Sequence, residues 1–158
     1  MNLNEEKKRL IISILIPLGI GFLSFLLTRN GIENYTLKLI KPFFAPPSFL
    51  FSIVWTILYI LMGISSFLIY ESMSCHKSNC LLLYILNLVL NFTWPIIFFN
   101  LEARLFAFLF ILLLDIVVVL MNLCFYGIDK RAGYLNVPYI IWLLFATILN
   151  FSVYLLNR

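Results

Sequence analysis

The chain has 158 residues, of which 63% are hydrophobic and only 11% are charged, and its mean hydropathy is +1.05. Soluble domains carry roughly one-quarter charged residues, so this composition excludes a water-soluble globular domain. The net charge of +4 comes from lysines and arginines scattered over the termini and over the gaps between apolar stretches. This scatter excludes the continuous basic surface of a nucleic-acid-binding protein.

Five apolar stretches follow one another along the chain, and each is long enough to cross a hydrocarbon core of about 30 Å. Lipid cannot satisfy open backbone groups, and the stretches lack the alternation of membrane β-strands, so the sequence predicts α-helices. The expected fold class is an all-α membrane protein, a single transmembrane domain of five helices over residues 1–158. The predicted spans are about 10–28, 47–70, 81–100, 104–126 and 134–156.

The first stretch runs from Leu10 to Leu27, which is longer than the apolar part of a signal peptide. No small-residue cleavage site follows it, so we expect a retained first helix. The longest gap, 29–46, contains the Asn30–Gly31 pair and several prolines, which disfavour continuous helix. We expect this gap to be a loop over one end of the bundle, and Pro47 to occupy the first turn of the second helix.

Basic residues divide almost evenly between the two ends of the predicted bundle. Six lie on the N-terminal side, at positions 7, 8, 9, 77, 130 and 131, and five on the opposite side, at positions 29, 38, 41, 104 and 158. In membrane proteins the cytoplasmic loops carry more lysine and arginine than the loops on the other side, so the count favours a cytoplasmic N-terminus. With no eukaryotic targeting segment visible, we expect a bacterial cytoplasmic membrane.

The cysteines and the single histidine are the candidate metal ligands. Cys75, His76 and Cys80 lie close together, but two thiols and one imidazole without a fourth ligand do not make a zinc site, so no metal site is predicted. The odd number of cysteines disfavours a disulfide framework. We expect these two cysteines and Cys124 to be free thiols.

Polar residues within the spans are candidate functional groups. Asn87, Asn91 and Trp94 share one face of the third span, where the amides either bond across helices or face a ligand. Asp115 is the only carboxylate deep in a span. It acts either as a proton relay or polar contact, or as a structural, neutral acid bonded to an asparagine or tyrosine.

Two tryptophans, Trp55 and Trp142, lie well inside their stretches, away from the membrane interface where tryptophans usually collect. They either stack on a flat ligand or pack in the core. Leu149, Tyr154 and Arg158 fit a permissive pattern proposed for cholesterol contact. No motif of familiar enzyme chemistry is visible in the sequence.

Three segments carry a family resemblance: Lys41–Pro47, which leads on to Val54–Tyr59; Asn91–Phe99; and Pro138–Asn150. Together they resemble the TspO/translocator protein family, also called tryptophan-rich sensory proteins or peripheral-type benzodiazepine receptors. The resemblance implies a five-helix bundle, usually a homodimer, with a ligand pocket under the first loop. The ligands it implies are porphyrins or haem-type tetrapyrroles, and in some members cholesterol and benzodiazepine-type drugs, with no required cofactor.

Residues carried over from the family motifs would line or close this pocket. They are Phe44, Pro46, Pro47, Trp55, Asn91, Trp94, Trp142, Ala146 and Leu149, and Asn87 joins them from the shared helix face. The sequence departs from the family at Phe44 and Tyr35, where tryptophan is typical, and at Phe110, where an acid is common. The expected function is a tetrapyrrole sensor; the alternatives are transport of porphyrin or lipid, and light-dependent porphyrin degradation.

Overall fold

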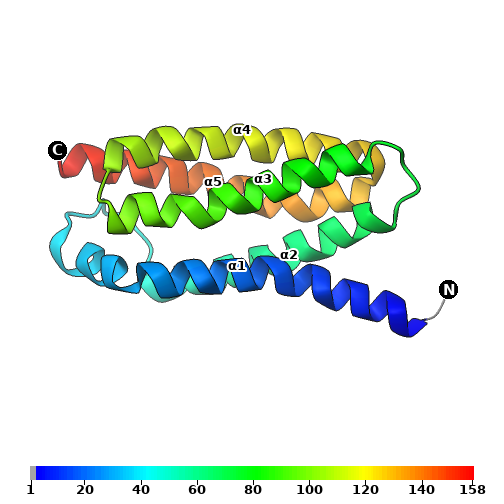
Figure 1. The fold of residues 1–158 in the computed structure, drawn as a ribbon. Coiled ribbons are helices and arrows are strands. Elements are labelled where there is room, and N and C mark those ends of the chain that lie inside the picture. Colours follow the sequence, from blue (N-terminus) through cyan, green and yellow to red (C-terminus); the bar gives the residue numbers. More distant parts are fainter. Residues whose placement is uncertain (1–2) are drawn as a thin grey trace.

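Long apolar runs with short polar gaps produce a bundle of long helices, shown in Figure 1. The computed structural model describes residues 3–158, except for the side chain at position 36. The helices are α1 (Leu3–Lys38), α2 (Ser48–Glu71), α3 (Lys77–Pro95), its π-helical continuation η1 (Ile96–Asn100), α4 (Arg104–Ile128) and α5 (Lys130–Leu156). Five candidate spans in the described residues are long and apolar enough to cross a membrane. The predicted all-α five-helix bundle is confirmed.

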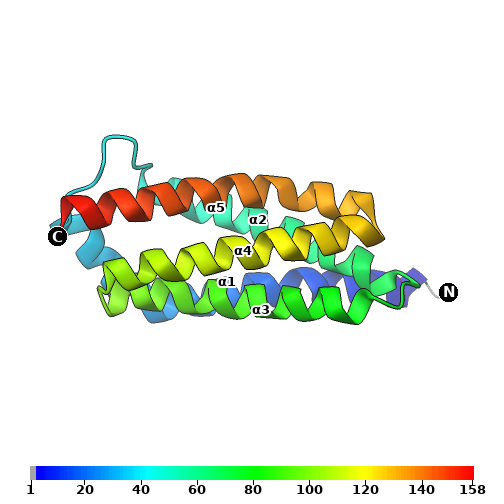
Figure 2. The ribbon, with the colours of Figure 1, turned by 90° about the horizontal axis from the view of Figure 1, so that it is seen from above.

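The helices pack in a closed ring in the order α1, α2, α5, α4, α3 and back to α1. Successive helices run in opposite directions, and the N-terminus lies at one end of the bundle while the C-terminus lies at the other (Figures 1 and 2). The α1–α2 connection reaches the same end as the C-terminus. We call this the loop end and the opposite end the N-terminal end.

The predicted loop 29–46 is wrong for its first ten residues, because α1 continues to Lys38. The Asn30–Gly31 pair lies inside the helix, where α1 crosses η1. A Cβ added at Gly31 would lie 2.5 Å from the carbonyl oxygen of Phe99, so glycine is present here for close helix packing. The amide of Asn100 donates to the carbonyl of Leu27 at 2.9 Å beside the crossing. These tertiary contacts outweigh the local preference of Asn–Gly for a turn.

Two prolines mark changes in backbone geometry. Pro47 is the N-cap residue of α2, with φ −62° and ψ 149°, one position before the first turn in which it was predicted. Pro95 ends α3, and the chain continues as the π-helical η1. Proline lacks an N–H and its ring crowds the preceding turn, which favours such a change of hydrogen-bond pattern.

Cys80 and Cys124 form a disulfide between α3 and α4, so the prediction of free thiols is wrong for this pair. Their Cα atoms lie 5.6 Å apart, within the normal range for a disulfide. The pair is 44 residues apart in sequence and is brought together only by the antiparallel packing of α3 and α4. Cys75 remains free and exposed. Because Cys80 is bonded, it is not a thiolate ligand for a metal shared with His76.

The α1–α2 contact depends on Gly63. A Cβ at this position would lie 2.5 Å from the Cα of Ile14, a backbone atom that cannot move aside, whereas a Cβ at Gly19 would meet nothing within 4 Å. We predict that Gly63→Ala lowers the free energy of unfolding by about 1–3 kcal/mol through overpacking. Gly19→Ala should leave stability unchanged or raise it. Thermal unfolding in detergent, followed by circular dichroism, measures both; equal stability of the two variants would contradict the predicted packing.

Candidate ligand-binding site

The two tryptophans predicted to face a ligand lie along the contact between α2 and α5. The ring of Trp142 lies 5.5 Å from that of Phe51, and the ring of Trp55 lies 6.2 Å from that of Tyr139, between ring centroids. Since α2 and α5 run in opposite directions, the two indoles lie about one helical turn apart on facing helices. Both are half-buried.

The connection 39–47 extends this row of rings toward the loop end. Phe44 contacts Phe145 at 6.3 Å, and Phe145 contacts Trp142 at 5.3 Å. We call the five residues Phe44, Phe51, Trp55, Trp142 and Phe145 the aromatic seam. Pro46 in the connection is half-buried and Pro47 is exposed.

Hydrogen bonds fix the connection to the end of α5. The backbone N–H of Ile40 donates to Asn157 Oδ1 at 3.0 Å, and Asn157 Nδ2 donates to the carbonyl oxygen of Ile40 at 2.8 Å. This reciprocal pair fixes the connection 39–47 beside the aromatic seam. The connection is shorter than the sequence indicated, and its role as a cover over one end of the bundle stays a prediction.

Three side chains on α5 carry buried polar atoms with no hydrogen-bond partner among the described residues: Oδ1 of Asn136, the indole Nε1 of Trp142 and both amide atoms of Asn150. Asn150 is only 2% exposed. Trp142, Ala146 and Asn150 follow at intervals of four and share one helix face. Buried polar groups normally have partners, so this face offers a donor and an amide to a bound molecule. Asn150 was missed as a site residue; its polarity within an apolar helix, eight residues after Trp142, is the signal.

The predicted polar face of α3 bonds across the centre of the bundle. Tyr139 donates its hydroxyl proton to Asn87 Oδ1 at 2.7 Å, and Asn91 Nδ2 donates to the Tyr139 oxygen at 2.6 Å and to Asn87 Oδ1 at 2.9 Å. All three side chains are buried. Of the two alternatives for the asparagines, the structure shows the interhelical bonds, and a ligand-binding role stays a prediction.

Comparison with known proteins decides the family. The sequence profile of the TspO/MBR family matches residues 13–156. The chain belongs to the TspO/MBR family. It is 40% identical over 149 residues to the tryptophan-rich protein TspO of Archaeoglobus fulgidus, covering 94% of this chain and 97% of that protein. It is 32% identical over 117 residues both to the tryptophan-rich sensory protein of Cereibacter sphaeroides and to the human translocator protein.

These two matches cover 74% of this chain and 73% of the Cereibacter protein, and 72% of this chain and 69% of the human protein. The family resemblance noted in the sequence is thus confirmed over nearly the whole chain. Together with the five apolar helices, it establishes an integral membrane protein.

Two further motif residues of this TspO/MBR family member, Trp94 and Leu149, pack in the hydrophobic interior next to Phe44 of the seam. Trp94 donates its indole N–H to the carbonyl oxygen of Ala107 at 3.1 Å and stacks on Phe98 at 5.1 Å. Leu149 is buried in the hydrophobic cluster that also receives Phe44 and Trp94. The structure therefore places the loop, α3 and α5 motifs in one contiguous apolar region, although Trp94 already has a protein partner for its donor.

Asp115 has a different partner from those considered in the sequence. Thr147 donates its hydroxyl proton to Asp115 Oδ2 at 2.8 Å and also to the carbonyl oxygen of Leu143 at 3.0 Å. The carboxyl group is half-buried between α4 and α5, beside an open apolar depression lined by the following residues of α4. It is not brought into the aromatic seam, and its role as a proton relay stays a prediction.

The three residues of the cholesterol pattern do not form one exposed surface. Leu149 is only 5% exposed and faces the interior, whereas Tyr154 is half-buried against Phe151 and Arg158 is exposed. A sterol on the outer surface could therefore contact the last two residues without reaching the first.

Tyr139 is the residue whose hydroxyl connects α5 to α3. We predict that Tyr139→Phe lowers the free energy of unfolding by about 1 kcal/mol, because Asn87 and Asn91 each lose a bond in an apolar interior. Tyr154→Phe is the matched control, since Tyr154 makes a ring contact with Phe151, and its hydroxyl has no hydrogen bond to lose among the described residues. Denaturant unfolding in detergent compares the two, and an equal effect would show that the network does not stabilise the bundle.

Proposed function

We propose that the protein is a membrane sensor of porphyrins and related tetrapyrroles, which bind at the aromatic seam beneath residues 39–47. The observation that carries this proposal is the combination of a row of aromatic rings in edge-on and tilted contact with the buried, unpartnered polar atoms of Trp142 and Asn150. The family supports it, because one relative is named a sensory protein and another a translocator protein.

The chemistry of the seam suits a large flat ligand with a few polar atoms. Aromatic faces stack on a macrocycle, and the part of each half-buried ring that is still exposed is apolar surface that a ligand can cover. The indole N–H of Trp142 and the amide of Asn150 would meet the ligand's polar groups, which fits the usual pattern of an apolar site with few polar contacts. Sterol-like and benzodiazepine-type molecules have similar flat apolar bodies and are further candidate ligands.

Ligand entry at the seam requires movement of the connection 39–47, because Phe44 packs on Phe145. A ligand that holds Phe44 away from Phe145 would shift the population of this connection and change the surface at the loop end. A second copy of the chain or another membrane protein would then respond to that surface. A homodimer is the assembly that the family resemblance implies.

The direct test is titration of detergent-purified protein with protoporphyrin in the dark, comparing wild type with Trp142→Phe, Trp55→Phe and Asn150→Leu. We expect saturable quenching of tryptophan fluorescence in the wild type and weaker binding in the variants. Phe22→Leu, a change of an exposed ring on α1, is the control for partition into detergent. No saturation below about 100 μM, which corresponds to roughly −5.5 kcal/mol, would rule out tetrapyrrole sensing.

The orientation in a bacterial cytoplasmic membrane rests on two opposing signals. The basic residues favour a cytoplasmic N-terminus by six to five, a difference of one residue. The disulfide joins the first turn of α3 to the last turns of α4, at the N-terminal end. Disulfides are rare where thiols are kept reduced. We infer that the disulfide is the stronger signal and that the N-terminal end faces the oxidising side.

Cys75 offers a test of this orientation because it is exposed and precedes α3 at the same end. We predict that an impermeant maleimide-polyethylene glycol adds one label to the protein in intact cells, and none to Cys75→Ser. Two further thiols should react only after reduction and unfolding. Labelling of Cys75 that appears only after the cells are permeabilised would place the N-terminal end in the cytoplasm.

A further inference from the structure

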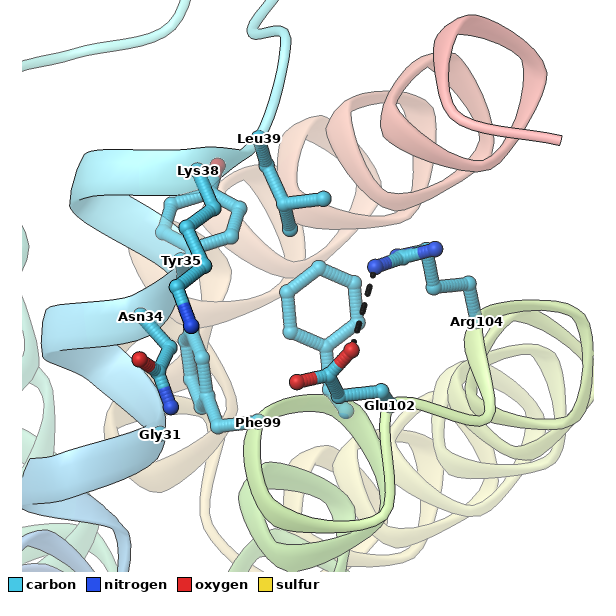
Figure 3. Close-up of a pocket in the computed structure, with 9 residues that line it drawn as sticks. Gly31, Asn34, Tyr35, Lys38, Leu39, Phe99, Glu102 and Arg104 are labelled. Atoms are coloured by element: carbon cyan, nitrogen blue, oxygen red, sulfur yellow. Dashed lines mark hydrogen bonds and ion pairs between the residues drawn. The ribbon is translucent and has the colours of Figure 1, made fainter.

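A hollow that shares no lining residue with the aromatic seam lies at the loop end (Figure 3). It is bounded by the end of α1, by η1 and by the start of α4. These are the loop-side ends of three spans, the depth at which lipid headgroups lie. The lining of the hollow includes Tyr35 and Lys38 of α1, Phe99 of η1, and the charged residues Glu102 and Arg104.

Arg104 brings hydrogen-bond donors that the protein leaves largely unused. Its Nη1 donates to the carbonyl oxygen of Asn157 at 3.3 Å and its Nη2 to Glu102 Oε2 at 3.4 Å, both beyond the usual range for a strong bond. Its Nε is buried and has no partner among the described residues. A guanidinium has five donors, so this one can still bind an anion.

Lys38 supplies a second cation from the opposite wall. Figure 3 shows Lys38 entering from α1 and Arg104 from α4, with the Glu102 carboxylate on the Arg104 side. The described residues show no ion pair or hydrogen bond for the Lys38 ammonium. One carboxylate faces two cations, and the Glu102 side chain is 59% exposed and free to turn outward. The hollow therefore has a net positive charge.

The turn that carries Glu102 and Arg104 has a strained backbone. Glu102 has φ +50°, in the left-handed region that normally favours glycine. The turn is held by bonds from the N–H of Leu101 to the carbonyl of Ile96 at 3.0 Å and from the N–H of Arg104 to the carbonyl of Glu102 at 2.9 Å. It directs both charged side chains to the same wall of the hollow (Figure 3).

We propose that this hollow binds the phosphate group of an anionic glycerophospholipid. Arginine and lysine together are the usual ligands of phosphate oxygens, and basic pockets between spans bind anionic headgroups. The volume of about 40 Å³ admits a small polar group and excludes a tetrapyrrole. Exposed leucines beside the hollow, Leu27 on α1 and Leu105 on α4, provide apolar surface along which acyl chains can lie.

Native mass spectrometry of delipidated protein titrated with dioleoyl phosphatidylglycerol tests this proposal. The variant is Lys38→Gln, an exposed side chain whose ammonium makes no bond within the part of the chain that the structure describes. The matched control is Lys130→Gln, an exposed lysine at the N-terminal end. We expect Lys38→Gln to weaken phosphatidylglycerol binding about fivefold, the effect of one basic residue near a lipid surface, and Lys130→Gln to leave it unchanged. Phosphatidylcholine has the same phosphate diester but also a choline cation, so it should bind more weakly, and Lys38→Gln should weaken its binding less than that of phosphatidylglycerol.

Two outcomes would overturn the proposal. Equal weakening by Lys38→Gln and Lys130→Gln would show that general surface charge, not the hollow, attracts the lipid. If inorganic phosphate binds the wild type but not Lys38→Gln, while phosphatidylglycerol shows no preference over phosphatidylcholine, the hollow takes free phosphate and no lipid. Lys38→Gln should leave protoporphyrin quenching unchanged, so this test and that of the seam fail or succeed independently.

Discussion

The hydroxyl of Tyr139 connects α5 to α3 through the centre of the bundle, and the relative height of these two helices depends on this link. The two helices lie across the ring from one another, so no direct backbone packing sets their relative height. In an apolar interior the amides of Asn87 and Asn91 need partners, and only one height of α5 brings the hydroxyl to both. That height also places Trp55 beside Tyr139 and Trp142 beside Phe51.

Close backbone contacts hold α1 against α2 and η1. Gly63 lets α1 meet α2, and Gly31 lets the same helix meet η1, each at a distance that a methyl group would prevent. Lipid gives no hydrophobic drive for association between helices, so van der Waals contact of this kind carries much of the attraction. At the N-terminal end, Arg9 adds an ion pair with Glu71 at 2.7 Å.

The loop end combines two sites of different chemistry around one residue. The side chain of Asn157 bonds to Ile40 in the connection over the aromatic seam, and its backbone carbonyl accepts a bond from Arg104 in the hollow. The seam is apolar with two unpartnered polar groups, whereas the hollow is basic and open to the headgroup region. The last turn of α5 therefore borders both sites.

The sequence by itself determined the five spans, the fold class and the placement of Trp55 and Trp142 inside them, because span length and hydropathy are local properties of the chain. The motifs around Pro47 and Trp142 also determined the family. Only the tertiary structure decided the end of α1, the Cys80–Cys124 disulfide, the bond from Thr147 to Asp115, the unpartnered amide of Asn150 and the basic hollow. Each of these depends on which helix faces meet, and the pairing of faces is set by contacts between residues far apart in sequence.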